Sequence, residues 1–102
     1  MKGRRLPDAP ANRWPPDGRR FRAGDYQLVH HPDGHRELWF RDPLGRSARL
    51  SGEIHRIVEE DDGTVSVPEG PGASGTGTNS ILVQRGPTEW HGYLEHGRWR
   101  AV

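Results

Sequence analysis

The sequence contains no cysteine among its 102 residues. This absence excludes disulfide bonds, thiolate zinc sites, iron–sulfur clusters and cysteine nucleophiles. A small chain without such cross-links depends on its hydrophobic core or on a larger assembly for stability. We therefore expect a protein without a cofactor.

Hydrophobic residues are also scarce, at 30% of the chain, while Gly and Pro number 14 and 9. Globular domains average about 45–50% on a count that includes glycine. The apolar residues lie mainly between Tyr26 and Val102, so we expect one domain there. No apolar run approaches the ~18–20 residues of a membrane span, and no apolar stretch of a signal peptide follows Met1. We expect no membrane contact and a cytoplasmic location.

The net charge of +1 conceals an asymmetry between the two parts of the chain. Residues 1–24 carry seven of the 15 Lys and Arg residues and two of the 14 acids, a net charge of +5. The remainder carries −4. A basic segment on an acidic body predicts contact with an acidic surface of protein or nucleic acid, although high arginine content also serves solubility.

Four prolines and no hydrophobic period occur in residues 1–20, so we predict that this stretch lacks regular secondary structure. We interpret residues 1–24 as an extended or disordered basic arm that docks on a partner. Trp14 either pins the arm to the body or anchors the partner. The predicted docking residues are Arg4, Arg5, Arg13, Trp14, Arg19, Arg20 and Arg22.

Residues 25–102 are typical of short strands separated by turns. The segments 26–30 and 37–41 predict a hairpin around Pro32-Asp33-Gly34, and 47–50 follows as another strand. Residues 54–58 are compatible with a helical turn or a strand, and Asp61-Asp62-Gly63 with a hairpin turn. Residues 80–84 indicate a buried strand. The fold class is all-β, a small antiparallel sandwich or a partly open barrel, with a mobile Gly-rich loop at 68–79.

The C-terminal residues 90–102 predict a last hairpin. Strand alternation places Trp90, Gly92 and Leu94 on one face and the residues between them on the other. The turn lies at His96-Gly97, where glycine tolerates a positive φ. We expect Trp99 to return into the core beside the outgoing strand.

No catalytic or metal site is predicted. Ser80, Asp42 and His91 are the members that a hydrolase triad would require, but none lies in a recognisable nucleophile motif. His31 and His35, with Asp33, are the best candidate metal ligands, and exposed turn histidines are the simpler interpretation. A cryptic hydrolase remains only a further alternative.

Nucleic-acid binding is the second hypothesis. Phe21 lies between Arg20 and Arg22, and Trp99 lies between Arg98 and Arg100. Arginines contact phosphates and aromatic rings stack on bases in single-strand binders. Trp99 is equally suited to the core, and the acidic body argues against this hypothesis.

The segments T-N-S-I-L-V (78–83) and W-H-G-Y-L-E-H-G-R-W (90–99) resemble the ending of small phage and prophage proteins of unknown function. In that family P-S-I-x-V precedes W-H-G-[YFW]-[LV]-x-x-G-x-W, and residues 62–67 are also similar. The likeness covers roughly residues 36–102. It implies zinc held by cysteines at positions equivalent to 41–45 and 87–89, which carry none here, so this chain would keep the scaffold without the metal.

Residues 88–93 (T-E-W-H-G-Y) are also similar to the second Rieske box, C-x-W-H-G-Y. Thr88 replaces the cluster cysteine and the first box is missing, so no [2Fe–2S] cluster is expected.

Together these patterns predict a non-enzymatic interaction or structural accessory module that docks through its basic arm. The resemblance implies a phage or prophage product, in which case the protein would be a virion component bound to shell subunits within a larger assembly. The salt dependence of DNA binding would separate this hypothesis from nucleic-acid binding.

Overall fold

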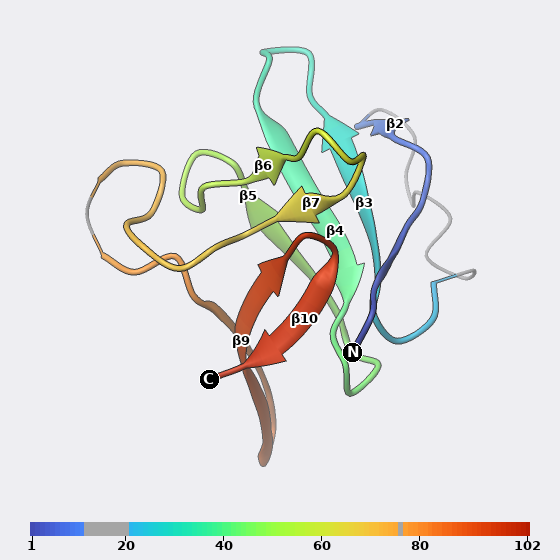
Figure 1. Ribbon diagram of the computed structural model, residues 1–102, viewed down its shortest axis with the longest axis vertical. Coiled ribbons are helices and arrows are strands. Elements are labelled where there is room, and N and C mark those ends of the chain that lie inside the picture. The colour runs from blue at the N-terminus through green and yellow to red at the C-terminus, as the bar shows by residue number, and fades with distance from the viewer. Residues whose placement is uncertain (12–20, 76) are drawn as a thin grey trace.

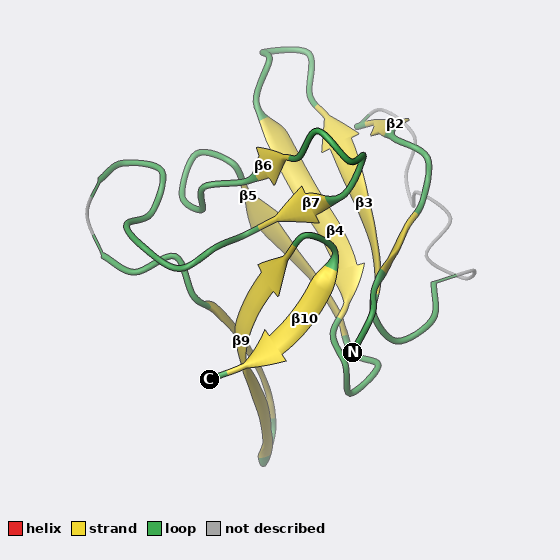
Figure 2. Cartoon of the chain, in the orientation of Figure 1, coloured by secondary structure: helices red, strands yellow, loops and turns green. Residues whose placement is uncertain are grey.

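The computed structural model describes residues 1–11, 21–75 and 77–102, and within these the fold is all-β, as predicted (Figures 1 and 2). No helix that could cross a membrane occurs in this part of the chain. The strands form three sheets, mostly antiparallel, and none of the sheets closes into a barrel. The strands are β1 (Arg4–Arg5), β2 (Ala9–Pro10), β3 (Asp25–His30), β4 (Arg36–Arg41), β5 (Ser47–Ser51), β6 (Val58–Glu59), β7 (Val65–Ser66), β8 (Ile81–Arg85), β9 (Thr88–Glu95) and β10 (Arg98–Ala101).

The first sheet is built on the meander β3-β4-β5. Two turns join its strands, the predicted one at Gly34 and a second at Gly45, with φ of 94° and 86° at these glycines. Tyr26 pairs with Phe40, and Leu38 with Leu50, so one face of the meander is apolar and buried. The hairpin prediction for this region is confirmed.

The second sheet has the order β10-β9-β8. Burial along β9 alternates as predicted, with Trp90, Gly92 and Leu94 inward. The turn to β10 places both His96 and Gly97 at positive φ, 47° and 74°. The predicted C-terminal hairpin and the predicted alternation of its side chains are therefore confirmed.

The segment after β5 forms turns before the short hairpin β6–β7, in which Gly63 takes a φ of 83°. Val67 then bridges to Leu94 of β9. The Gly-rich loop 68–79 follows, and Asn79, buried at its end, bonds the backbone of Arg56 and Pro68. The β6–β7 hairpin covers one end of the space between the two larger sheets (Figure 1).

The N-terminal residues differ from the prediction. β1 and β2 pair in parallel with β3, and the N–H of Gly3 donates to Gly97 O at 2.7 Å while Trp99 N–H donates to Met1 O at 2.8 Å. The expectation that residues 1–20 lack regular secondary structure is wrong for these short strands. An edge of β3 offers unpaired backbone groups, and an extended Pro-containing segment can satisfy them. Residues 12–20 lie outside the described residues.

The core lies between the two larger sheets, and the first residues of the chain link β3 to β10. Trp99 is central to it, with ring centroids 5.2 Å from Phe40, 5.6 Å from Trp90 and 6.5 Å from Tyr26. The buried cluster consists of Tyr26, Leu28, Leu38, Phe40, Leu50, Ile57, Val65, Val67, Ile81, Val83, Trp90, Leu94 and Trp99.

Candidate interaction surfaces

Arg4, one of the predicted docking residues, is bound to the body of its own domain. Its guanidinium donates to Asp25 at 2.6 and 3.2 Å, and the Asp25 carboxylate is buried. The same carboxylate accepts the backbone N–H of Arg22 at 2.8 Å. Asp25 is the first residue of β3, and its carboxylate therefore holds both Arg4 and Arg22 to this strand.

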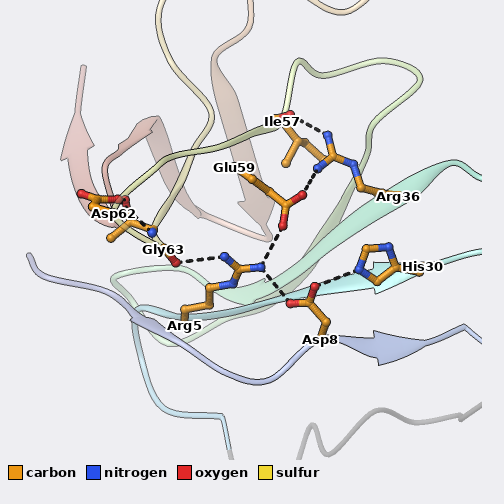
Figure 3. Close-up of polar contacts among 9 residues, drawn as sticks. Arg5, Asp8, His30, Arg36, Ile57, Glu59, Asp62 and Gly63 are labelled. Atoms are coloured by element: carbon orange, nitrogen blue, oxygen red, sulfur yellow. Dashed lines mark hydrogen bonds and ion pairs between the residues drawn. The ribbon is translucent and has the colours of Figure 1, made fainter.

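Arg5 is the centre of a second polar network, drawn in Figure 3. Its guanidinium donates to Gly63 O at 2.9 Å and to the carboxylates of Asp8 and Glu59 at 3.0 Å each. Arg36 donates to Glu59 from the other side at 3.1 Å. These contacts join β1 to the β6–β7 hairpin and to β4.

Asp8 extends this network to β3, because His30 lies 2.9 Å from its carboxylate (Figure 3). Burial by itself would raise the pKa of Asp8, but the hydrogen bonds with His30 and Arg5 outweigh burial and the pKa is lowered. The carboxylate is thus held in its charged form. Asp8, Arg5 and His30 together fasten the N-terminal strands to the sheet.

These contacts divide the predicted docking residues into two groups. Arg4 and Arg5 serve internal ion pairs, whereas Arg22 is exposed. The chain is bonded to the sheet on both sides of residues 12–22, since Ala11 N–H donates to His30 O and Gly24 N–H donates to Arg41 O, each at 2.9 Å. Within this basic segment (12–22), the candidates that lie outside the described residues are Arg13, Trp14, Arg19 and Arg20.

The C-terminal nucleic-acid candidates do not form an arginine–aromatic platform. Trp99 is 4% exposed and donates its indole N–H to Gly24 O at 2.8 Å. Arg100 forms ion pairs with Glu69 and Glu95 and lies 5.0 Å above the Tyr93 ring. Arg98 is exposed, as is Arg22, and Phe21 is half-buried. Strand alternation explains the result, because neighbours in β10 point to opposite faces.

Four of the six histidines, His30, His31, His35 and His96, lie within ion-pair distance of carboxylates. His31 and His35 stack with ring centroids 4.0 Å apart, but each bonds its own acid at 2.5 Å, Glu37 and Asp33 respectively. The hydrogen bond with Asp33 raises the pKa of His35. Among the described residues there is no group of three side chains that could hold a metal ion.

Asp42, a candidate member of a hydrolase triad, has a structural partner. Its fully buried carboxylate accepts Arg46 Nε at 2.8 Å and lies 2.7 Å from Arg46 Nη2. Arg46 also donates to Thr88 Oγ1 at 2.5 Å and to Val83 O at 3.1 Å. The turns at 41–45 and 87–89 are thus adjacent, and the half-buried Arg46 joins them.

The sequence prediction missed an open groove between β5 and β8. It has a volume of about 410 Å³ and is lined by Trp39, Ser47, Ala48, Arg49, Leu82, Val83 and Arg85. Leu82 is 55% exposed and Gln84 is also exposed, so the prediction of a buried strand at 80–84 is wrong at these two residues. Alternation could have indicated the groove, because Trp39 lies between the inward-facing Leu38 and Phe40.

Comparison of the chain with protein-family models, with curated proteins and with solved structures finds no match.

Proposed function

We propose that this protein is a non-enzymatic interaction or structural accessory module, and that its basic segment (residues 12–22) docks on an acidic partner surface. Four arginines and one acid lie within these eleven positions, the acid being Asp17. This charge is favourable for association with a negative surface, since electrostatic attraction raises the rate of encounter.

The observation that carries the proposal is that the chain is bonded to the sheet on both sides of this arginine-rich segment, since Ala11 N–H donates to His30 O and Gly24 N–H to Arg41 O. Elsewhere in the chain, Arg36, Arg46 and Arg100 are paired with carboxylates of the same chain. Arg4 and Arg5 are paired in the same way, and these ion pairs hold the residues before the basic segment to the rest of the domain. The basic segment is therefore attached to the domain at both ends. This attachment reduces the entropy that the segment loses on binding a partner.

The family resemblance suggests a phage particle as the setting, with the segment joining neighbouring shell subunits. An acidic protein surface is the partner class that this proposal commits to. Nucleic acid is an outcome of its test, because the arginine–aromatic pattern at the C-terminus is not an exposed platform.

The test measures binding of a fluorescent polyglutamate peptide and of a single-stranded oligonucleotide of matched charge. A variant with Arg13, Arg19, Arg20 and Arg22 changed to Ser should lose about tenfold or more in affinity for polyglutamate. The matched control changes the same four residues to Lys, which keeps the charge. It should retain most of the affinity.

Binding should weaken as salt is raised, since both partners are charged. Unchanged affinity in the Ser variant would refute the role of the basic segment. Stronger binding of the oligonucleotide, with a steep salt dependence that the Ser variant loses, would reassign the segment to nucleic acid. Thermal melts of both variants establish that the domain remains folded.

A further inference from the structure

The start of the chain and β10 bring two positively charged residues side by side. Lys2 and Arg98 are partners in an antiparallel bridge. The hydrogen bonds of this bridge are donated by the N–H groups of Gly3 and Trp99, the residues that follow the two partners, at 2.7 and 2.8 Å. Lys2 and Arg98 are therefore a non-hydrogen-bonded pair, the type in which the Cα atoms are only about 4.5 Å apart and the side chains lie closest.

Both side chains of this pair point away from the core. The next residues, Gly3 and Trp99, face inward, because Trp99 is 4% exposed and a Cβ at Gly3 would lie 2.9 Å from its indole nitrogen. Neighbouring residues of a strand point to opposite faces, so Lys2 and Arg98 share the outer face. Both residues are exposed to solvent.

Within the described residues, no carboxylate forms an ion pair with Lys2 or Arg98. Glu95 lies across from Arg98 on β9, but its carboxylate accepts Arg100 Nε at 2.5 Å. Like charges directly opposite each other in a sheet are destabilising. The domain therefore holds two uncompensated positive charges together at a cost to its own stability.

The Lys2–Arg98 pair adjoins the described end of the basic segment. A Cβ at Gly3 would lie 2.8 Å from Gly24 O, so residues 22–24 pass close to the start of the chain. Arg22 is exposed, and none of the carboxylates that the structure describes pairs with its guanidinium. The positive surface of the basic segment thus continues onto the outer face of β10.

We propose that Lys2 and Arg98 bind a carboxylate of the acidic partner and extend the docking surface beyond the basic segment. This inference rests on the proposed function, because the partner is the same. An ammonium and a guanidinium each donate charge-assisted hydrogen bonds to a carboxylate. A carboxylate bound between them would offset their mutual repulsion. Two linked contacts with one partner bind more strongly than either contact alone.

The surroundings of the pair favour a carboxylate over a single-stranded nucleic acid. Binders of single strands combine positive charge with accessible aromatic rings on which bases stack. Trp99 is buried, and Phe21 is half-buried. The Tyr93 ring has the Arg100 guanidinium 5.0 Å from its centre. The pair therefore offers charge without an open stacking surface among the described residues.

The experiment titrates the full chain into the fluorescent polyglutamate peptide. A variant that combines Lys2→Ser and Arg98→Ser should lose about fivefold or more in affinity. The matched control combines Lys2→Arg and Arg98→Lys, which keeps both charges, and should bind nearly as wild type does. Arg85→Ser removes an exposed arginine from β8, which β9 separates from β10, and should also leave the affinity nearly unchanged.

Lys2→Glu separates binding from stability. It places a negative charge across from Arg98, so the melting temperature should equal or exceed that of wild type. The affinity for polyglutamate should nevertheless fall about tenfold or more, because the new glutamate takes the place of the bound carboxylate. A clear fall in the melting temperature of Lys2→Glu would contradict the repulsion on which the proposal depends.

The two proposals fail in different ways. Wild-type affinity of the Lys2→Ser and Arg98→Ser variant would refute the carboxylate site, while loss in the Ser variant of the basic segment would still support the proposed function. Loss only when the pair is removed would refute the role of the basic segment and retain the site. Binding of the oligonucleotide that depends on the pair, without binding of polyglutamate, would overturn the carboxylate assignment.

Discussion

Trp99 lies between two arginines in the sequence, yet its side chain is the most connected aromatic ring of the core. It contacts Tyr26, Phe40 and Trp90 and donates its indole N–H to Gly24 O. The hydrogen bond satisfies the one polar atom of a buried indole. The two neighbouring arginines point to the opposite face, so local charge says little about the position of this residue.

We predict that Trp99→Ala destabilises the domain severely, whereas His91→Ala leaves stability nearly unchanged. Loss of a buried indole costs about 3–5 kcal/mol, a large share of the ~5–15 kcal/mol of a typical domain. His91 is a half-buried residue of the opposite face of β9. Thermal melts of the two variants provide the measurement. A Trp99→Ala variant that melts with wild type would contradict the core position of this ring.

Gly92 shows a second constraint at the scale of one residue. A Cβ at this position would lie 2.1 Å from Arg100 O and 2.7 Å from the Trp90 ring. The glycine is therefore required for close approach of β10 and of the indole, and not for a positive φ. Strand alternation alone indicates only that Gly92 faces inward.

At the scale of elements, the N-terminal segment is an integral part of the β-structure. Residues 1–3 bond the turn and first residues of β10, and residues 4–6 bond β3. Gly3 lies where the segment passes between them. A Cβ there would lie 2.8 Å from Gly24 O and 2.9 Å from both Gly97 O and the Trp99 indole nitrogen. The two sheets are thus joined through a residue that must be small.

We predict that Gly3→Ala lowers the free energy of unfolding by about 1–3 kcal/mol, since an added methyl group in a filled site forces the backbone to shift. Lys2→Ala is the matched control, because Lys2 is exposed. Urea unfolding of the two variants measures the difference. Equal stability of Gly3→Ala and wild type would show that the segment does not pack tightly against the hairpin.

At the scale of the whole molecule, pairs between acids and bases set the dependence of stability on pH. Hydrogen bonds from His35, Thr64 and Arg100 lower the pKa values of Asp33, Asp62 and Glu95 from ordinary values of 3.8, 3.8 and 4.5. A carboxylate with a lowered pKa stabilises the fold above its unfolded pKa, and this stability is lost as pH falls.

His35 has the opposite sign. Its pKa is raised above 6.5 by Asp33, so its contribution is complete below that value and is lost as pH rises through the raised pKa. We predict the highest melting temperature between about pH 5 and 6, with a decline below about pH 4. Asp62→Asn should reduce the acidic decline, and His35→Gln should reduce the weaker alkaline decline. A melting temperature constant down to about pH 3 would contradict the prediction.

We further predict that the folded protein carries no stoichiometric metal. Cysteine is absent from the sequence. His31, His35 and His96 each bond a different carboxylate, so they do not converge on one ion. Elemental analysis of protein purified without chelator measures the content. About one zinc per chain, lost in His31→Ala, would contradict the expectation.

Local chemistry was enough to predict most strands and turns. The hairpins around Gly34 and Gly97, and the inward face of Trp90 and Leu94, follow from glycine at positive φ and from the two-residue period of a strand. These features depend on residues close together in the chain. For that reason a single sequence contains them.

Tertiary structure alone decided the remainder. The pairing of residues 1–10 with β3 and β10, the ion pairs of Arg4 and Arg5, and the groove beside Leu82 depend on groups far apart in sequence. Alternation indicates which face of a strand a residue occupies, but not which distant segment lies against that face. Whether an arginine serves the fold or a partner is determined by that distant segment, because only a nearby carboxylate compensates its charge.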